Sequence, residues 1–245
     1  MNRPAPPQHE LISFFRGNSG DRLHSRSVSE VVLSGSVDVP MPPARLLADW
    51  EREISSQLAL EPGDVEALPL ARARARWPDY RRCVQAVADW THAQGLPGVL
   101  ASSDIALMAC RGAKYHHDGM QYGFAAFCNL FMSEDKGLDL HFPFADRRIP
   151  LKRGTVVIFD TGQPHAVIRR GGSGFDAADF ADGTDCNQVF LTWELPIEDA
   201  EVARALGIDF DIASRAATQP DEESLVLDGE PAVVCPDSGR WLRTG

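Results

Sequence analysis

The stretch Tyr115-His116-His117-Asp118-Gly119 and the later stretch Gln163-Pro164-His165-Ala166-Val167 contain the residues that decide how this chain is interpreted. On an extended segment, residues two apart point to the same side. His116 and Asp118 can therefore face one interior while His117 faces away from it. His165 lies at the start of a second apolar segment that can bring it to the same interior. The pattern predicts a site made of two imidazoles and one carboxylate.

Such a set has a specific chemistry. Two imidazoles and one carboxylate occupy one face of an octahedral metal and leave the opposite face open. The open face suits non-haem Fe(II), which must bind both a cosubstrate and O₂. We interpret His116, Asp118 and His165 as the metal ligands and the catalytic centre. For any single histidine, the alternative is a polar residue whose hydrogen bonds are satisfied at a sheet edge.

The sequence around these residues predicts a mainly β fold. The predicted strands are short, rich in β-branched and aromatic residues, and bounded by Gly, Pro or Asp. They cover residues 105–110, 123–132, 138–144, 155–160, 165–169 and 187–195. This spacing indicates a β-sandwich or barrel with flanking helices.

We predict a single domain over residues 1–245. Residues 1–30 mix Pro, Gly, Ser and Asn, which predicts a poorly ordered N-terminal segment. Residues 42–97 carry helical periodicity over 44–60 and again from Trp77-Pro78 towards Gly95, so they predict helical support. The core follows over 98–197. Residues 198–245 predict a short helix over 198–206 and a hairpin turned at Asp228-Gly229, which could pair across a homodimer or close over the active site.

Composition narrows the classes of partner. The net charge of −11 argues against nucleic acid, because phosphate binding needs clustered Lys and Arg. The basic run from Arg72 to Arg76 has a helical pattern and is interpreted as a solvated face. No apolar segment approaches the length of a membrane span. The five cysteines are scattered without a C-x-x-C pair, so we expect neither a zinc ribbon nor a disulfide framework, and a reducing cytoplasm as the location.

The segment from Cys110 to Arg170 resembles the 2-oxoglutarate/Fe(II)-dependent dioxygenase superfamily, nearest to its prolyl-4-hydroxylase-like branch. The resemblance is carried by Arg111-Gly112 leading into His116-His117-Asp118, by the apolar strand ending in Asn129-Leu130, and by Gly154-Thr155-Val156-Val157-Ile158-Phe159 leading to His165. It implies a double-stranded β-helix, which is a jelly-roll, cupin-like barrel. It also implies Fe(II) held by His116, Asp118 and His165, with 2-oxoglutarate as cosubstrate and O₂.

The chain departs from the superfamily at the cosubstrate anchor. The family commonly holds the distal carboxylate of 2-oxoglutarate with Arg or Lys on the strand after the distal His, and Gln188 stands at that place here. An amide can hydrogen-bond a carboxylate but lacks the charge-assisted pair that Arg offers. Arg169 has the strand parity of His165 and is the candidate replacement; a surface arginine at a strand end is the alternative. Asn129 is a further candidate for binding the cosubstrate.

The resemblance implies a hydroxylase acting on a small-molecule or amino-acid-like substrate. Two alternatives remain open: a cupin-type metal enzyme that uses no 2-oxoglutarate, and a catalytically silent jelly-roll binding module. Between the strand of His165 and that of Gln188 lies a Gly-rich, acidic segment, residues 171–186. Its length predicts either a mobile segment that orders over the barrel mouth or a solvated connection.

Overall fold

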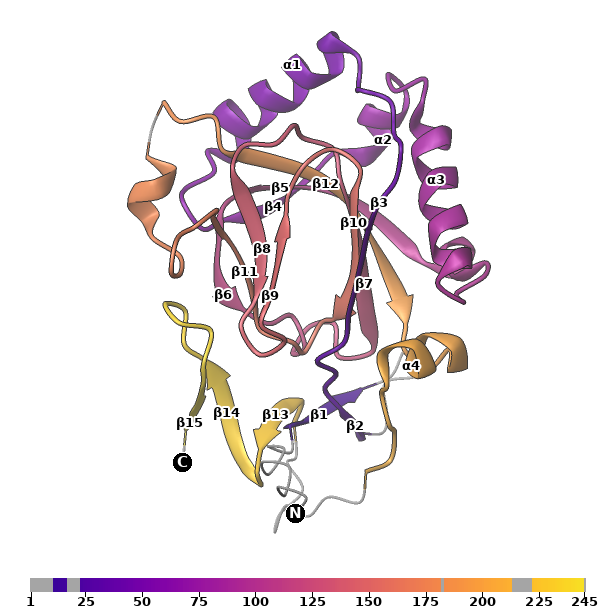
Figure 1. The fold of residues 1–245 in the computed structure, drawn as a ribbon, viewed down its shortest axis with the longest axis vertical. Coiled ribbons are helices and arrows are strands. Elements are labelled where there is room, and N and C mark those ends of the chain that lie inside the picture. Colours follow the sequence, from indigo (N-terminus) through magenta and orange to yellow (C-terminus); the bar gives the residue numbers. More distant parts are fainter. Residues whose placement is uncertain (1–10, 17–22, 182, 213–221, 245) are drawn as a thin grey trace, which may run out of the picture.

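The computed structural model describes residues 11–16, 23–181, 183–212 and 222–244 of the chain. Its centre is a barrel made of two antiparallel sheets that face each other (Figure 1). The larger sheet has the strand order β3 (Val32–Ser36), β10 (Thr155–Asp160), β7 (Ala125–Phe131), β12 (Asn187–Pro196), β5 (Asp104–Arg111) and β4 (Val65–Leu68). The smaller sheet has the order β6 (Ala113–His116), β11 (His165–Arg169), β8 (Leu138–Phe142) and β9 (Arg147–Pro150). The predicted jelly-roll is therefore present.

Strand alternation separates the interior of the barrel from its outer face. On β12, Phe190 belongs to the cluster inside the barrel, whereas Leu191 and Trp193 belong to the cluster outside it. The two faces of one strand thus serve two cores, because successive side chains of a strand point in opposite directions. This explains why the strand sequences are apolar almost throughout rather than alternating with polar residues.

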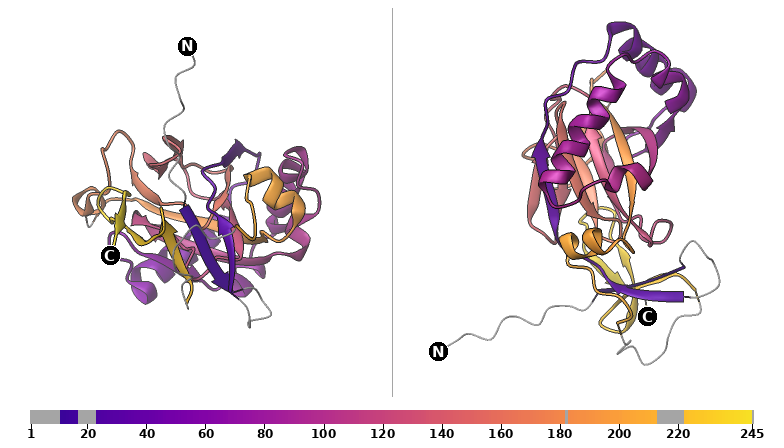
Figure 2. Two further views of the ribbon diagram at one scale, coloured as in Figure 1. Left: turned by 90° about the horizontal axis from the view of Figure 1, so that it is seen from below. Right: turned by 90° about the vertical axis from the view of Figure 1, so that its right-hand side faces the viewer.

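Three helices cover the outer face of the larger sheet (Figures 1 and 2). They are α1 (Ala44–Glu53), which continues as the π-helix Ile54–Leu58, α2 (Leu70–Arg74) and α3 (Tyr80–Ala93). The two predicted helices are thus confirmed. Buried side chains of α1 and α3, among them Trp50 and Val87, share one core with the outward-facing residues of the sheet. A short 3-10 helix, Val99–Ser102, leads from this helical layer into β5.

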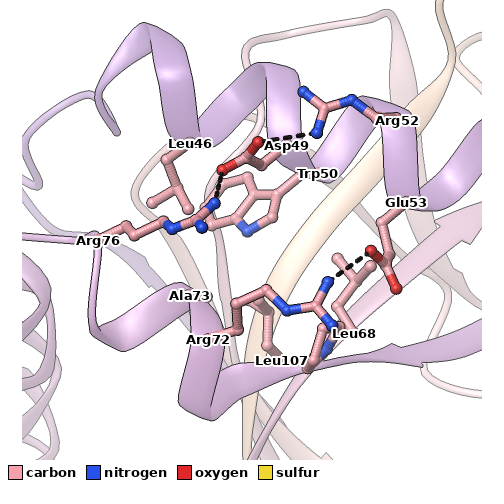
Figure 3. A pocket seen from close by; sticks show the side chains of 11 residues that line it. Leu46, Asp49, Trp50, Arg52, Glu53, Leu68, Arg72, Ala73, Arg76 and Leu107 are labelled. Carbon is pink, nitrogen blue, oxygen red and sulfur yellow. Dashed lines mark hydrogen bonds and ion pairs between the residues drawn. The ribbon is translucent and has the colours of Figure 1, made fainter.

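The basic run lies at the surface between α1 and α2. Figure 3 shows Arg76 and Arg52 directed at Asp49, and Arg72 directed at Glu53, around the ring of Trp50. The arginine side chains are about half exposed or more. Exposed pairs of this kind contribute roughly 0–1 kcal/mol each. The structure confirms that this segment is helical and solvated.

A third sheet joins the two ends of the chain and corrects the expectation for residues 1–30. Its order is β15 (Trp241–Arg243), β14 (Glu230–Val234), β13 (Ser224–Leu227), β1 (Leu11–Arg16) and β2 (Leu23–Ser27). The predicted hairpin is β13–β14, and it pairs with β1 of the same chain. Residues 11–16 and 23–27 are ordered because Ile12 and Phe14 form a small core with Val226. Residues 1–10 and 17–22 lie outside the described part.

The terminal sheet lies at one end of the barrel, with the helix α4 (Ala200–Leu206) beside it (Figures 1 and 2). All five cysteines are free thiols, and four of them are buried. In the described part of the chain, no helix combines the length and the apolar character needed to cross a bilayer.

Candidate functional site

The structure brings His116, Asp118 and His165 together at the end of the barrel that faces the terminal sheet. One ligand atom from each lies within 4.8 Å of the others. His116 Nε2 is 3.8 Å from one carboxylate oxygen of Asp118, and His165 Nε2 is 3.5 Å from the other. His116 and His165 are directly opposite each other in the pairing of β6 with β11. His117 turns away and packs against Trp241, as strand alternation predicts.

Hydrogen bonds orient both imidazoles. Nδ1 of His116 lies 2.7 Å from the carbonyl oxygen of Lys114, and Nδ1 of His165 lies 3.0 Å from that of Gln163. A carbonyl oxygen can only accept, so both Nδ1 atoms carry the proton and both Nε2 atoms are left as lone-pair donors facing Asp118. Metal-ligating histidines are oriented in this manner.

The turn that follows β10 holds two of the ligands in place. The backbone N–H of Asp118 donates to the carbonyl of Thr161 at 2.8 Å. The hydroxyl of Thr161 donates to the carbonyls of Tyr122 and Ala125. The turn continues into Gln163, whose carbonyl orients His165. A single turn, residues 160–163, therefore positions ligands that come from two different strands.

A buried ion pair fixes this turn. Arg26 on β2 donates to both carboxylate oxygens of Asp160, at 2.6 and 2.8 Å, and neither side chain is exposed. Arg26 also donates to the carbonyl of Gly123, in the loop that follows Asp118. Asp160 accepts further bonds from the backbone of Ser29 and Gly162. Bidentate pairs of this type fix geometry as well as contributing energy.

Burial sets the charge of the ligands. Desolvation, with a smaller contribution from His116, holds the pKa of His165 well below its usual range, so its imidazole is neutral at pH 7. Desolvation raises the pKa of Asp118, which His116 only partly offsets. Burial also lowers the pKa of His117 to about 4. A carboxylate that has lost water and faces two imidazole lone pairs is a site that a divalent cation would stabilise.

The three ligands line a cavity of about 410 Å³ inside the barrel. Its walls are mostly apolar and come from both sheets: Met108, Phe127, Phe131, Leu140, Phe159, Val167 and Phe190. Its polar residues other than the ligands are Glu66, Gln121, Tyr122, Asn129, Thr192 and Glu194. None of the described residues that line the cavity is Lys or Arg. A mostly apolar cavity with a few converging polar groups is the usual form of a small-molecule site.

Two buried polar atoms in the cavity wall have no hydrogen-bond partner in the described part of the chain and are therefore available to a polar cosubstrate beside a metal at the triad. Asn129 Oδ1 and Thr192 Oγ1 are buried in the cavity wall and have no hydrogen-bond partner among the described residues. Each such atom costs on the order of 1–3 kcal/mol when left unpaired. Asn129 and Thr192 are cross-strand neighbours in the pairing of β7 with β12. Together they fit the polar end of a ligand that extends from the metal into the barrel.

The two residues predicted to hold the distal carboxylate lie beyond the lining of the cavity. Arg169 is half-buried, and its guanidinium donates to the carbonyl of Lys136 at 3.3 Å. Gln188 is fully buried on the cavity face of β12, one alternation deeper than Phe190, and neither atom of its amide has a partner among the described residues. Arg170, which follows β11, pairs with Asp135 and Asp139.

The described part of residues 171–186 packs on the outside of the barrel and, at Gly174, comes close to Tyr115 and to the backbone of Asp237. The segment begins after Arg169, at the opposite end of β11 from His165. It contains a 3-10 helix, Ala177–Phe180, whose Phe180 is fully buried and accepts a hydrogen bond on its carbonyl from Arg111. Phe180 and Cys186 belong to the barrel core, so this part of the segment is anchored without substrate. That the segment orders over the mouth when substrate binds stays a prediction.

Several site residues were not singled out in the sequence, namely Arg26, Tyr122, Asp160, Thr161, Thr192 and Glu194. Thr192 and Glu194 could have been found by counting in twos from Gln188, since all three lie on the inward face of one strand. Arg26 gave no such signal, because its segment was expected to be poorly ordered.

No family model matches the chain, and no curated protein matches it in sequence. Solved structures do show similarity. A truncated viral collagen prolyl hydroxylase from Paramecium bursaria Chlorella virus-1 aligns over 67% of this chain and 88% of its own, with 9% identity and a TM-score of 0.39. Its 2OG complex aligns over 67% and 94%, with 8% identity and a TM-score of 0.39.

The non-heme alpha ketoglutarate dependent epimerase SnoN from nogalamycin biosynthesis is also similar. It aligns over 78% of this chain and 88% of its own, with 14% identity and a TM-score of 0.34.

Proposed function

We propose that this protein is a non-haem Fe(II)- and 2-oxoglutarate-dependent oxygenase that hydroxylates a small molecule. The observation that carries the proposal is the meeting of His116, Asp118 and His165 at one end of a mainly apolar cavity. Two imidazoles and one carboxylate form the open-faced ligand set that such chemistry requires. The motif resemblance of residues 110–170 points the same way.

The metal and its cosubstrates, when bound, supply the oxidising chemistry; the protein supplies orientation, a dry cavity and electrostatics. His116 and His165 present Nε2 atoms fixed by backbone carbonyls. Asn129 and Thr192 offer unpaired polar atoms to the cosubstrate, with Gln188 and Arg169 further along the barrel. The aromatic walls exclude water from the reacting centre.

An anaerobic titration tests metal, cosubstrate and geometry together. Fe(II) is added to the protein, then 2-oxoglutarate, and the visible metal-to-ligand charge-transfer band is followed. The proposal expects a saturable band in the wild type and none in Asp118→Ala. A protein that binds Fe(II) but shows neither the band nor slow consumption of 2-oxoglutarate under air is not a 2-oxoglutarate enzyme.

That last outcome would favour a second candidate, a cupin-type metal enzyme that uses no oxoacid. One observation supports it: the described lining of the cavity contains no Lys or Arg to pair with a distal carboxylate. A chain that binds no divalent metal at all would instead be a catalytically silent binding module.

A further inference from the structure

Glu194 is a half-buried carboxylate in the wall of the cavity. It follows Phe190 and Thr192 on the inward face of β12, and all three line the same cavity as the metal ligands. Its side chain is half-buried, and no described residue forms an ion pair or a side-chain hydrogen bond with it. Burial, together with the nearby charge of Asp104, raises its pKa. A partly desolvated carboxylate that faces a cavity without a partner is costly unless a ligand pairs with it.

The surroundings of Glu194 are negative rather than neutral. Asp104 is its cross-strand neighbour on β5. The carboxylates that line the cavity are Glu66, Asp118 and Glu194, and the only basic side chains among the described lining residues are the imidazoles of the two metal ligands. The negative charge of Glu194 also contributes to raising the pKa of Tyr122, across the same end of the cavity. A metal at the triad would offset Asp118 but would leave Glu194 uncompensated.

The aromatic residues next to Glu194 determine which apolar group the ligand should carry. Phe127 is the cross-strand neighbour of Glu194 on β7, and Phe159 lies next to it on β10. Their rings pack edge to face, 6.0 Å apart. A ligand that reaches Glu194 therefore contacts aromatic surface on the way. The volume of about 410 Å³ accommodates a small molecule.

We propose that the prime substrate of this cavity is a small amine, with an ammonium group that pairs with Glu194 and an apolar or aromatic skeleton that lies against Phe127 and Phe159. The substrate class rests on the proposed function, because it presumes that the cavity beside the metal is the reaction site. Anionic compounds of the same shape are excluded by Glu194 and Asp104, since like charges brought together repel.

Three probes of matched shape test the proposal: 2-phenylethylammonium, 2-phenylethanol and 3-phenylpropionate, each titrated calorimetrically at pH 7.5. We expect wild-type protein to bind the ammonium probe about tenfold or more tightly than the alcohol, as a charge-assisted hydrogen bond predicts, and the carboxylate most weakly. Equal binding of the three probes, or no measurable binding of the ammonium probe, overturns the proposal.

Glu194→Gln removes the charge and keeps the shape, so it should abolish the preference for the ammonium probe. Glu198→Gln, an exposed site just past the end of β12, makes the same chemical change outside the cavity and should keep it. If the Glu194→Gln protein still binds the ammonium probe more tightly than the alcohol, the ammonium group binds elsewhere and the proposed role of Glu194 is wrong.

The titrations are run with Mn(II) present and again with a chelator. The amine preference is read directly in both conditions, so it is independent of turnover. If no charge-transfer band forms but the protein still prefers the ammonium probe through Glu194, only the oxygenase proposal is contradicted. If the band forms but the protein shows no preference for the ammonium probe, only the amine proposal is contradicted.

Discussion

At the scale of single residues, the contrast between the neighbours His116 and His117 gives a sharp prediction. His116 faces Asp118, while His117 packs against Trp241 outside the cavity. We expect Ala substitution of His116, Asp118 or His165 to abolish activity and sharply reduce metal content, because the metal would then keep only two protein ligands. His117→Ala should retain the metal. Metal analysis of the purified variants is the measurement, and full occupancy in Asp118→Ala would show that the assignment is wrong.

A second prediction at this scale concerns the cosubstrate. Thr192→Val removes a hydroxyl without a large change in volume, and we expect it to weaken 2-oxoglutarate binding about tenfold, since hydrogen bonds to charged groups are worth ~1.5–3 kcal/mol. The sequence instead predicts a tenfold effect for Arg169→Ala. Titration of the charge-transfer band in both variants decides between them. A large effect of Arg169→Ala alone would mean that its guanidinium leaves the Lys136 carbonyl and reaches the cosubstrate.

The sequence predicts a residue's place in the candidate site where the pattern that reveals it is local. His116 ends β6 and Asp118 follows it by two positions, so the parity of an extended segment places both on one face. Arg26 could not be predicted, because its partner Asp160 is 134 positions away and nothing in either local pattern requires the pair. Strand parity from Gln188 places Glu194 on the inward face of β12, but its neighbours Asp104 and Phe127 become known only from the pairing with β5 and β7.

At the scale of elements, the turn 160–163 links the metal ligands to the terminal sheet through Arg26. Arg26→Met leaves Asp160 buried and uncompensated, and breaking a buried pair in this way costs ~3–5 kcal/mol. We expect the free energy of unfolding in urea to fall by that amount. We also expect metal affinity to fall in the fraction that remains folded, because the turn holds the backbone of Asp118 and the imidazole of His165.

Arg243→Met is the matched control, since Arg243 pairs with Asp228 and Glu230 at the surface of the same terminal sheet. It should change stability by roughly 1 kcal/mol or less and leave metal affinity unchanged. Normal metal affinity in folded Arg26→Met would show that the ion pair supports the fold without positioning the ligands.

The segment after β11 yields a third variant at this scale. Phe180 stacks on Phe175 at 5.3 Å and is fully buried, so Phe180→Ala should destabilise the fold by ~3–5 kcal/mol. Because Phe180 is anchored beside Arg111, at the end of β5 away from the ligands, coupled and uncoupled turnover of the folded variant should decrease together, if at all. A selective loss of coupled turnover would support the expectation that the segment orders over the substrate.

The long core strands were predictable because each is an apolar run between turn residues, and the structure reproduces all six within a few positions. The shorter strands β4 and β9 were missed. β9, Arg147–Pro150, has only one buried residue, Ile149, and β4 has only Leu68. Segments of four residues with one buried side chain carry no periodicity that a sequence can reveal; their pairing with β8 and β5 makes them strands.

At the scale of the whole molecule, the ends of the chain form the sheet that supports the metal site. Phe14 on β1 is opposite Ser224 on β13, and Phe15 packs close to Gly123 in the loop after Asp118. The polar composition of residues 1–30 suggested little structure there. Composition failed because the four apolar residues of β1 suffice for a strand whose partner comes from the other end of the sequence.

Metal binding should therefore stabilise the whole fold, since the ligands come from two segments of the chain that are far apart in the sequence, and the terminal sheet holds them. A ligand at 100 times its Kd stabilises the native state by about 2.7 kcal/mol. For a chain of this length each kcal/mol raises Tm by roughly 2–4 °C, so Mn(II) should raise Tm by roughly 5–11 °C. The measurement is thermal unfolding with Mn(II) and with a chelator.

Asp118→Ala is the control that separates this effect from general cation binding. The chain carries a net charge of −11, so divalent ions can also bind acidic surface, and the scans are run at 0.15 M salt to screen such contacts. The variant should unfold at the same temperature with and without Mn(II). An equal rise in wild type and Asp118→Ala would place the cation elsewhere on the molecule, and the site described here would then have to be explained without a metal.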